Sequence, residues 1–448
     1  MSAPIPSDAS AHVAHSASDV RRVSTLLGIL FGFAGMGSAA AALALAPMAE
    51  EYGISIGAAA WSISLYALML GVGTAVYGRV ADLVGTRYPM LVGLGLMVTG
   101  AMVAALAPTF AVHLAGRLLQ GAGVAAVPTL GAAIVSARYQ GEIRTAALLR
   151  MAATAAAVTS MGPLAGGIAV DTLGWRVAIA LPILGVLMIP ALWSAMEVGG
   201  TGARLDFLGA FLTALAAGGV VLLIQSPSTG VAVAIAGFGL VLFGVPAVAL
   251  WVRKRPHGFL PIEVIRNPYV VRSAVAAAAV PASWFALLVG VPVVLLSHGW
   301  EPWQVGLTLV PSGLISLFLP RIVGPLMNRI SSAQALMLST SIAAGALLVA
   351  ALGAGLASAP LLIVSVIGVT FAFGIGQPAM AAAVGAAVDE DVRGVALGVA
   401  TLVFMVGGSV GAAIVGGLGS VIGIGEAIAV LTLLPVLGLI VVAPTRRT

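Results

Sequence analysis

The sequence has little charge and no cysteine. Charged residues make up only 8% of its 448 residues, whereas 60% are hydrophobic, and the mean hydropathy is +1.15. Soluble domains carry roughly 25% charged residues, so this composition excludes a water-soluble fold. Without cysteine there are no disulfides or thiolate metal sites, and the five histidines have no metal-ligand spacing. We therefore predict an integral membrane protein with no metal and no other cofactor.

Fourteen long apolar segments fill most of the chain. An α-helix rises about 1.5 Å per residue, so about 20 residues cross the hydrocarbon core of a bilayer. The segments are continuous and rich in Leu, Ala and Gly, which excludes the alternating pattern of a transmembrane β-barrel. The expected fold class is all-α, with fourteen transmembrane helices at 26–47, 61–80, 90–108, 112–136, 146–168, 176–195, 207–225, 231–252, 273–297, 304–323, 335–356, 360–383, 395–419 and 424–443.

The basic residues predict the orientation of these spans. With an even number of spans, both chain ends lie on one side. If that side is the inside, all but two of the 20 basic residues, Arg117 and Arg176, fall in inside loops or near inner span ends. The positive charge therefore indicates orientation and not a nucleic-acid partner. We expect a multi-pass protein of a bacterial cytoplasmic membrane with both termini cytoplasmic; Arg21 and Arg22 could also form an export signal, but no cleavage site follows.

Two polar breaks divide the chain into groups of six, two and six spans. The longer one, residues 253–272, contains charge and proline, which exclude a continuous span there. The shorter one covers residues 199–206. The expected organisation is a tail over 1–25, a six-helix bundle over 26–198, two extra central helices over 199–255, a cytoplasmic loop over 256–272, a second six-helix bundle over 273–443 and a tail over 444–448.

The polar break after the second span carries a distinctive motif, Gly-x-x-x-Asp-x-x-Gly-x-Arg, at residues 78–87. Gly78 and Gly85 permit a close helix approach and a tight reversal. Asp82 can accept hydrogen bonds at a helix N-terminus, and Arg87 can bind a carboxylate or terminal carbonyls. The motif therefore predicts a breakable latch, although a simple inside loop would have a similar composition.

A weaker copy of this motif follows the second span of the last six helices, at residues 324–331. Asn328 stands there in the position that corresponds to Asp82. The two groups of six spans are therefore interpreted as degenerate copies of one another, with a charged latch in the first copy only.

Arg117 lies about two helical turns into the fourth span, where an arginine is costly and usually functional. Gln120 follows at i+3 and Gly121 lies beside it, which predicts a tightly packed, hydrogen-bonded helix face. The alternative is an arginine that extends to the outer surface and keeps its charge in water.

The fifth span contains the stretch Gly-Pro-Leu-Ala-Gly-Gly at residues 162–167. Gly162 and Gly166 form a small-residue contact face, with Gly167 beside it, and Pro163 removes one helical hydrogen bond and kinks the span. A kinked helix with small residues can rock against its neighbour, although ordinary close packing would need the same residues.

These three stretches resemble the signatures of the major facilitator superfamily that follow span 2, lie in span 4 and lie in span 5. In that family the span-5 signature is associated with exporters. The two extra central helices are similar to those of its fourteen-span drug/proton antiporter branch. Further similarities to this branch occur at residues 174–176, 205–209 and 407–411.

The resemblance implies two bundles related by a pseudo-two-fold axis, a substrate cavity near mid-membrane and alternating access by rocking. It also implies that Asp82 and Arg87 hold the inner side closed against the second bundle, and that Arg117 and Gln120 take part in proton relay. Many proton-coupled members carry a carboxylate in span 1 or in the second bundle. Here the expected spans 1 and 9–13 contain none, so proton antiport follows from the resemblance alone.

Large or polar side chains that interrupt Ala-, Val- and Gly-rich spans are candidates for the cavity lining. Aromatic and Met side chains suit promiscuous apolar ligands, although each could equally serve helix packing. Arg150, near the start of span 5, could extend to the inner surface or contact an anionic ligand. The other candidates are Phe33, Met36, Trp284, Gln377, Phe404 and Met405.

We interpret the chain as a secondary active transporter and not an enzyme, because it contains no nucleophile–base pair, phosphate loop or metal cluster. It would export small, largely apolar molecules such as drugs, antibiotics or toxic metabolites. Its partners would be the small-molecule substrate, the lipid bilayer and, by resemblance, protons, and it would act as a monomer. Two alternatives stay open: an exporter of one specific metabolite, amino acid derivative or lipid, and a non-transporting membrane sensor or scaffold.

Overall fold

The computed structural model describes residues 17–196, 206–327 and 329–442, and every regular element in these ranges is helical. The first half of the chain comprises α1 (Ala17–Leu43), α2 (Leu45–Tyr52), α3 (Ile56–Ala59), α4 (Trp61–Val84), α5 (Arg87–Ala105), α6 (Phe110–Val124), α7 (Ala126–Arg138), α8 (Gly141–Ser160), α9 (Gly162–Leu173), α10 (Trp175–Ala180), η1 (Leu181–Met188), α11 (Ile189–Leu192) and η2 (Trp193–Ala195).

The extra pair consists of α12 (Phe207–Thr229) and α13 (Val231–Lys254). The short helix α14 (Ile262–Arg266) connects the pair to the second half. The second half comprises α15 (Pro268–Ser297), α16 (Pro302–Met327), α17 (Ser332–Gly355), α18 (Ala359–Ala386), α19 (Glu390–Ile422), α20 (Ile424–Leu431) and α21 (Leu433–Val442).

Within the described residues, fourteen helical segments are long and apolar enough to cross a membrane. Each overlaps one of the fourteen expected spans, so the predicted all-α fold class with fourteen spans is confirmed. Several spans are built from two or more successive helices, for example α8 and α9 in the fifth span. Hydropathy predicts spans well because an unpaired backbone group in hydrocarbon is costly and a helix pairs all of them.

Several spans start earlier than expected, and polar side chains at the helix starts explain two of these differences. The described part of the first helix begins at Ala17 and not at residue 26. Asp19, in its first turn, binds Arg138 and the Tyr139 hydroxyl. The ninth span begins at Pro268 and not at residue 273, because the Asn267 side chain accepts hydrogen bonds from the first free amides of α15.

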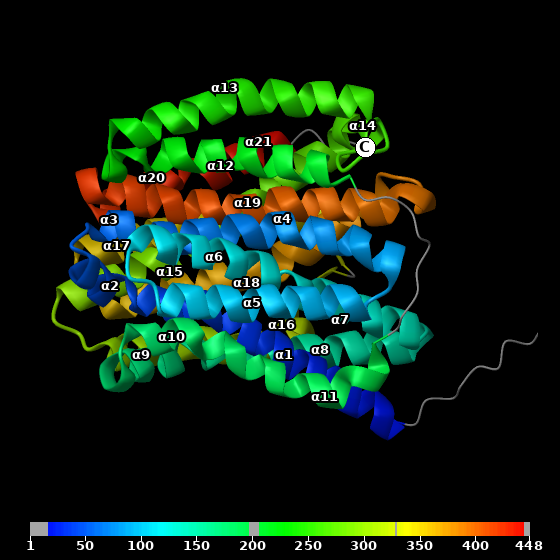
Figure 1. Cartoon of the computed structure of the whole chain (residues 1–448), viewed down its shortest axis with the longest axis horizontal. Coiled ribbons are helices and arrows are strands. Elements are labelled where there is room, and N and C mark those ends of the chain that lie inside the picture. Colours follow the sequence, from blue (N-terminus) through cyan, green and yellow to red (C-terminus); the bar gives the residue numbers. More distant parts are fainter. Residues whose placement is uncertain (1–16, 197–205, 328, 443–448) are drawn as a thin grey trace, which may run out of the picture.

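The turns between spans lie at two opposite ends of the molecule, which we call the Gly53 end and the Gly85 end. In Figure 1 the Gly53 end, with α2 and α3, is on the left, and the Gly85 end, where α1 begins, is on the right. Glycines with positive φ make five of the Gly53-end turns, since no side chain opposes that conformation. These glycines are Gly53, Gly174, Gly230, Gly299 and Gly423.

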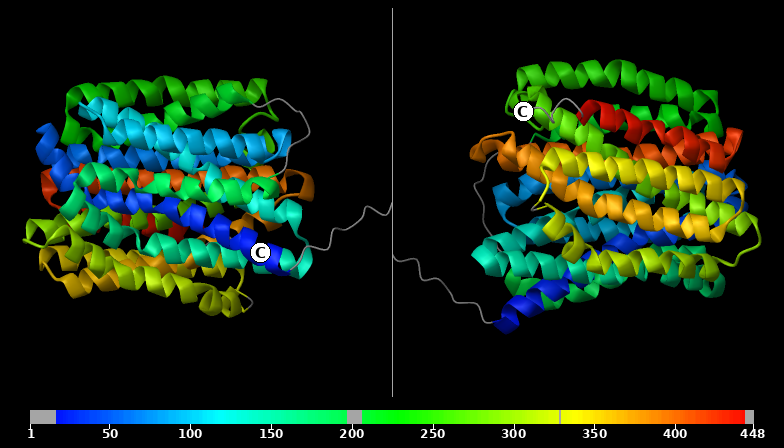
Figure 2. Two further views of the ribbon diagram at one scale, coloured as in Figure 1. Left: turned by 60° about the horizontal axis from the view of Figure 1, so that its bottom comes forward. Right: turned by 180° about the vertical axis from the view of Figure 1, so that it is seen from behind.

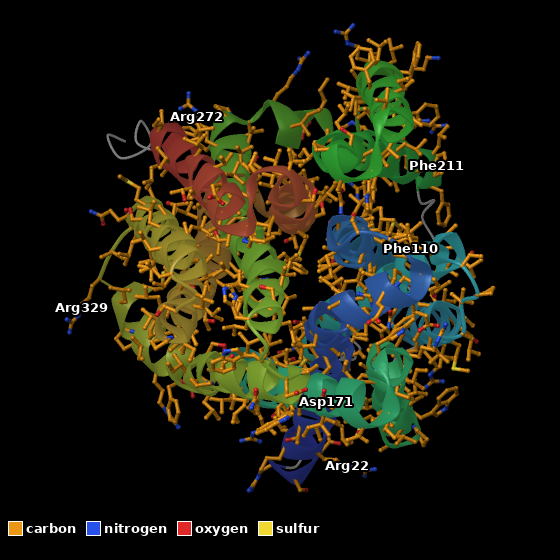
Figure 3. The ribbon with its side chains drawn as sticks, turned by 90° about the vertical axis from the view of Figure 1, so that its left-hand side faces the viewer. Arg22, Phe110, Asp171, Phe211, Arg272 and Arg329 are labelled. Carbon is orange, nitrogen blue, oxygen red and sulfur yellow. The ribbon has the colours of Figure 1, made fainter. Side chains whose placement is uncertain are left out.

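Viewed from the Gly53 end, the helices form two groups and a protruding pair. Figure 3 shows the blue-to-teal first half beside the yellow-to-red second half, with the green extra pair above the junction. The right view of Figure 2 shows the yellow and orange helices of the second half together on the back of the molecule. Helix α12 packs against α4 of the first half and α19 of the second, while α13 packs chiefly on α12.

Two seams join the halves, one between α4 and α19 and one between α8–α9 and α16. Glycine closes the second of them. A Cβ atom at Gly167 would lie 2.5 Å from the Pro302 carbonyl oxygen, and Gly306 and Gly313 leave no space for one beside Pro163 and Ser160. The Trp303 amide also donates to the Asp171 carboxylate, 3.0 Å away. These contacts all lie in the part of the fifth span nearer the Gly53 end.

The same seam is looser toward the Gly85 end. A Cβ atom at Gly324 of α16 would meet no atom within 4 Å. On the opposite helix, residues 141–146 and Arg150 are exposed. The seam is therefore packed tightly at the Gly53 end and not at the Gly85 end.

The fifth span is interrupted at Met161, between α8 and α9, immediately before Gly162 and Pro163. This is the break expected from the missing proline amide. Beyond it, α9 packs on α1: a Cβ atom at Gly166 would lie 2.7 Å from Ala40 Cα, and one at Gly162 would lie 3.2 Å from Met36 Cγ. The predicted small-residue face therefore meets the first span.

This packing predicts a graded response to leucine. Gly166→Leu must force α1 and α9 apart and should destabilise the protein by about 1–3 kcal/mol or more, as overpacking does in other tight cores. Gly162→Leu should cost less, because its contacts are longer: a Cβ atom there would lie 3.2 Å from Met36 Cγ and 3.3 Å from Met36 Cα. Thermal unfolding of the purified variants in detergent measures the order.

The matched control is Gly95→Leu, at a helical glycine whose Cβ would meet no atom within 4 Å. Its unfolding temperature should stay near that of the wild type. Equal losses in the Gly95 and Gly166 variants would contradict the proposed close contact of α1 with α9.

Candidate functional site

Arg117 of α6 is completely buried and joins several helices of the first half. Its Nε donates to the Ser62 carbonyl at 2.9 Å, and its two terminal nitrogens donate to the Gln120 side chain and the Gly37 carbonyl. Its guanidinium carbon lies 4.3 Å from the centre of the Tyr66 ring. Within the described residues it forms no ion pair with a carboxylate. Neutral oxygens and one aromatic face therefore solvate this charge.

The neighbours of Arg117 extend the network to two more backbone positions. Gln120 donates from its amide nitrogen to the Ile179 carbonyl of α10 at 3.1 Å, and the Tyr66 hydroxyl donates to the Ala34 carbonyl of α1 at 3.2 Å. The residues predicted to act together, Arg117 and Gln120, are thus in contact. The interpretation of Arg117 as a surface-seeking side chain is wrong, because its exposed fraction is 0%.

His113, one turn before Arg117, was not predicted as a site residue. Its Nε2 lies 2.9 Å from the Ser62 hydroxyl and its Nδ1 lies 2.9 Å from the Ala104 carbonyl, so both ring nitrogens have partners. Its spacing from Arg117 on one helix face was the available signal. The ring is surrounded by the aromatic side chains of Tyr52, Phe110 and Trp175.

Arg176, the second basic residue outside the expected inner side, is also paired. It lies at the Gly53 end, where one terminal nitrogen donates to the Glu51 carboxylate and the other to the Ala105 carbonyl. The hydrogen bond from Arg176, together with that from the Trp175 indole, lowers the pKa of Glu51 below its ordinary value. Both Glu51 and Arg176 keep substantial exposure, so the pair orders this turn and adds little stability.

The 78–87 motif is only partly as expected. Gly85 ends α4 with φ of 79°, which confirms the tight reversal. Gly78, by contrast, lies inside α4 at an ordinary packing distance: a Cβ atom there would be 3.8 Å from Thr129 Cγ2. The side chain of Asp82 and the whole of Asn328 lie outside the described residues.

Two arginines of the motif have defined partners. Arg87 donates to the Trp193 and Met196 carbonyls, at 3.2 and 2.9 Å, so in this conformation it binds the end of the sixth span and not the second half. Arg79, which the sequence analysis did not select, donates to the Phe259 carbonyl at 3.1 Å. Its place inside the motif was the available signal.

Of the cavity candidates in the second half, Trp284 and Phe404 belong to one aromatic row. Phe373 of α18 lies between them, with ring centroids 6.3 Å from Trp284 and 5.4 Å from Phe404. Phe373 was not predicted, because nothing in the sequence distinguishes it from its neighbour Phe371. Gln377, one turn away on α18, is exposed.

The remaining candidates lie at helix contacts or at the surface. Met36 packs against Gly162, Phe33 packs against Gly185 of η1, and Met405 packs against Gly71 at the contact of α4 with α19. Gly121 is likewise a close contact, beside the Tyr66 backbone. Arg150 is exposed whereas Arg117 is completely buried, so the described structure does not bring the two together.

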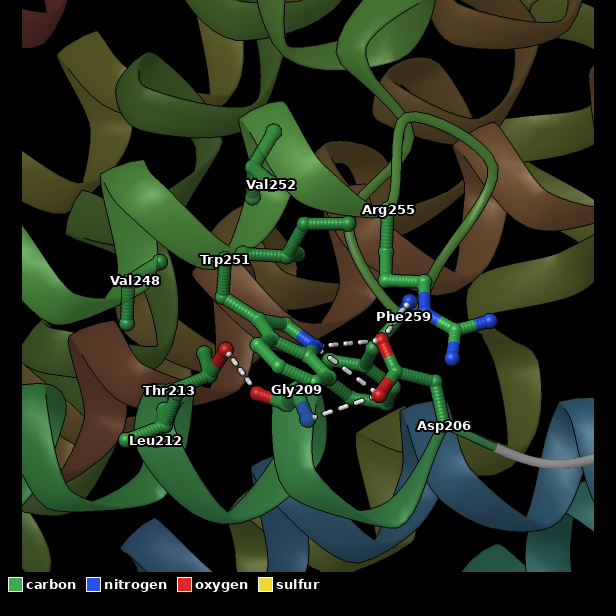
Figure 4. A pocket seen from close by; sticks show the side chains of 10 residues that line it. Asp206, Gly209, Leu212, Thr213, Val248, Trp251, Val252, Arg255 and Phe259 are labelled. Carbon is green, nitrogen blue, oxygen red and sulfur yellow. Dashed lines mark hydrogen bonds between the residues drawn. The ribbon is translucent and has the colours of Figure 1, made fainter.

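Asp206 organises a further polar cluster at the Gly85 end, shown in Figure 4. Its carboxylate accepts hydrogen bonds from the Trp251 indole at 3.0 and 3.1 Å, the Phe259 amide at 2.9 Å and the Gly209 amide at 3.0 Å. Burial alone would raise the pKa of Asp206, but these hydrogen bonds and nearby Arg255 lower it below its ordinary value. We call Asp206, Gly209, Trp251 and Phe259 the Asp206 cluster.

The burial of Arg117 predicts a large loss of stability on truncation. Arg117→Ala would leave the Gln120 side-chain oxygen without its donor in a dry interior and would remove the hydrogen bonds to the Ser62 and Gly37 carbonyls, which should cost about 2–5 kcal/mol. Arg150→Ala, at an exposed arginine, should unfold at the wild-type temperature. Thermal unfolding of the two purified variants makes the comparison, and equal unfolding temperatures would contradict the assigned network.

Comparisons with known proteins agree with this architecture. The sequence profile described as Major Facilitator Superfamily matches residues 25–412. The multidrug resistance protein Stp of Mycobacterium tuberculosis is 27% identical over 304 residues, which cover 65% of this chain and 56% of Stp. The methylenomycin A resistance protein of Bacillus subtilis is 28% identical over 214 residues, 46% of each chain. The matches thus span about half the length of these relatives.

Solved structures give the same fold over nearly the whole chain. A POT family transporter in complex with 5-aminolevulinic acid has a TM-score of 0.68 at 14% identity, covering 94% of both chains. A peptide transporter POT in complex with sulfate has a TM-score of 0.69 at 16% identity, covering 95% of this chain and 94% of that one. Together with the profile match and the fourteen spans, these results show that the chain is a multi-pass membrane protein that belongs to the Major Facilitator Superfamily.

Proposed function

We propose that the protein exports small, largely apolar molecules, such as drugs, antibiotics or toxic metabolites, by alternating access and in exchange for protons. Drug export is supported by its relatives, which include a multidrug resistance protein and an antibiotic resistance protein. The main structural support is the uneven seam between the halves. A transporter that rocks must close one end while the other is free to open.

The conformation fits one state of such a cycle. The glycine contacts of Gly167, Gly306 and Gly313 close the seam of α8–α9 with α16 at the Gly53 end, and Gly324 leaves it loose at the Gly85 end. The Gly85 end also carries most of the arginines, so by the positive-inside rule it would face the cytoplasm. The state would then be closed to the outside, with both chain ends in the cytoplasm.

The two bundles of six spans would be the moving bodies, with 26–198 and 273–443 as their proposed bounds. Glycines lie at close contacts of both seams, for example Gly306 beside Pro163 and Gly416 beside Ala60, and such small residues allow small rotations with few collisions of side chains. The 78–87 motif lies at the end that would open and close toward the cytoplasm. Asp82 is therefore proposed as the charged member of a cytoplasmic gate.

Proton coupling would have to use groups other than a buried acid. The buried polar side chains of the described residues include Arg117, His113 and Gln120 but no Asp or Glu. The proposed relay role of Arg117 and Gln120 rests on the family resemblance. Their contacts with three other spans would let a change in hydrogen bonding at Arg117 reach α1, α4 and α10.

A transport assay tests the function. Purified protein in liposomes should move members of a panel of apolar drugs and antibiotics, faster with a pH gradient than without. The Asp82→Asn variant should transport at least about tenfold more slowly and unfold at the wild-type temperature, because the substitution removes the charge of the gate. One charge-assisted hydrogen bond is worth about a factor of ten or more in rate.

Each alternative has its own outcome in this assay. Transport of a single compound class would favour a specific metabolite exporter. The absence of flux under any gradient would overturn the proposal and favour a membrane sensor. Wild-type flux in the Asp82 variant would contradict the gate alone.

The preferred charge of the substrate follows from the absence of buried acids among the described residues. A permanent cation at mid-membrane loses several kcal/mol of hydration even after relaxation, and a cation–π contact with a ring such as Trp284 returns about 2 kcal/mol. We therefore expect neutral, zwitterionic or weakly acidic compounds to bind more tightly than lipophilic dications. Competition binding of size-matched compounds measures the order, and a tightly bound dication that is released at low pH would contradict it.

A further inference from the structure

The extra pair is attached to the rest of the molecule by a small set of polar contacts, and the Asp206 cluster is the most concentrated of them. Asp206 begins α12, Trp251 lies near the end of α13, and Phe259 belongs to the segment that follows (Figure 4). One carboxylate thus gathers donors from both helices of the pair and from the chain beyond it. Because the acceptor is ionised, these are among the stronger hydrogen bonds in the protein.

Phe259 connects this cluster to α4. Its amide donates to Asp206 at 2.9 Å, and its carbonyl accepts from Arg79 at 3.1 Å. Its side chain is 2% exposed and packs in a cluster with Val72 of α4 and Leu402 of α19. The backbone of Phe259 is therefore hydrogen-bonded through its amide to Asp206 and through its carbonyl to an arginine of the 78–87 motif.

A second polar contact joins the pair to the same span at the Gly53 end. Gln225 near the end of α12 is completely buried and donates to the Gly57 carbonyl of α3 at 3.3 Å. Against α19, by contrast, α12 packs on glycine: a Cβ atom at Gly417 would lie 2.7 Å from the Ile224 carbonyl oxygen. Within the described residues, α12 is hydrogen-bonded to α3–α4 by a side chain and meets α19 through smooth backbone contacts.

We propose that Asp206 is a positioning residue that holds the Phe259 backbone against Arg79, so that the extra pair braces the second span and fixes the 78–87 motif at the cytoplasmic gate. The role of this brace in gating rests on the proposed transport function, whereas the contact between Asp206, Phe259 and Arg79 does not. Asp206 itself touches no substrate. It acts through Phe259 and Arg79 on the span that would have to move.

The brace predicts a change in distance that does not depend on any substrate. The chain has no native cysteine, so spin labels at His257→Cys and Tyr88→Cys, both exposed at the Gly85 end, report only the separation of the 253–260 segment from the start of α5. Double electron–electron resonance on wild-type background should give one narrow distance distribution. Asp206→Asn should broaden it, because the amide presents N–H groups to the Trp251 and Phe259 donors.

A double variant tests whether Asp206 and Arg79 act through one shared contact or independently of each other. Arg79→Gln alone should broaden the same distribution. If Asp206 and Arg79 act through the Phe259 backbone, the distance distribution of the double variant should be no broader than that of the wider single variant. Transport by the double variant should be slowed by about tenfold, as in each single variant, and not by about a hundredfold. Asp206→Glu, which keeps the charge, should recover part of both.

Asp389→Asn is the matched control. Asp389 also precedes a helix at the Gly85 end, but its side chain makes no capping hydrogen bond, so the label distances and transport should stay at wild-type values. If Asp206→Asn does not fold, Trp251→Phe removes a single donor and serves the same comparison.

The outcomes for the brace and for the function are distinct. An unchanged distance distribution in the Asp206 variant, or effects of the two single variants that add in the double, would overturn the brace even if the protein transports. A wild-type protein that shows the expected distance changes but no flux would overturn the proposed function and leave the brace in place.

Discussion

A guanidinium buried without an acid is the interaction on which the first half of this protein depends. Arg117 can stay charged inside the membrane region only if enough oxygens point at it, and these come from Ser62, Gln120 and Gly37 on three different spans. The ring of Tyr66 adds an electrostatic contact. Each of these partners has a fixed place in its helix, so the charge sets the relative positions of α1, α4 and α6. These hydrogen bonds and the ring contact offset the free-energy cost of burying the charge.

Glycine serves the complementary purpose, since polar networks fix helices whereas small residues let them slide. Three close helix contacts show this: Gly166 of α9 meets α1, Gly306 of α16 meets α9, and Gly411 of α19 meets α15, and no polar side chain is among the nearest atoms at any of them. In a bilayer there is no hydrophobic gain from bringing two helices together, so packing area and close backbone approach have to supply the attraction. A seam of this kind can hold two halves together and still permit rotation.

The spans, their number and the turn at Gly85 could be predicted because each depends on local chemistry, either hydropathy over about 20 residues or the conformational freedom of one glycine. The identity of contacts could not. Arg87 was expected to face the second half but binds Met196, and nothing near Phe259 in the sequence indicates that Arg79, 180 residues away, will reach it. Likewise Gly78 has the right residue type for a close approach but no neighbour close enough to need it.

The scarcity of charge has a different meaning at the ends of the helices than in their middle. Asp19, Glu51 and Asp206 all lie at helix ends, where each accepts hydrogen bonds from groups that belong to other helices. Such ionic contacts can break and form in contact with water at moderate cost, whereas the same contacts at mid-membrane would be close to permanent. With these acids at helix ends and glycines along the seams, specific and reversible contacts lie where the proposed rocking motion would open and close the molecule. Among the described residues, the buried charge is that of Arg117, and it is held by oxygens that do not titrate.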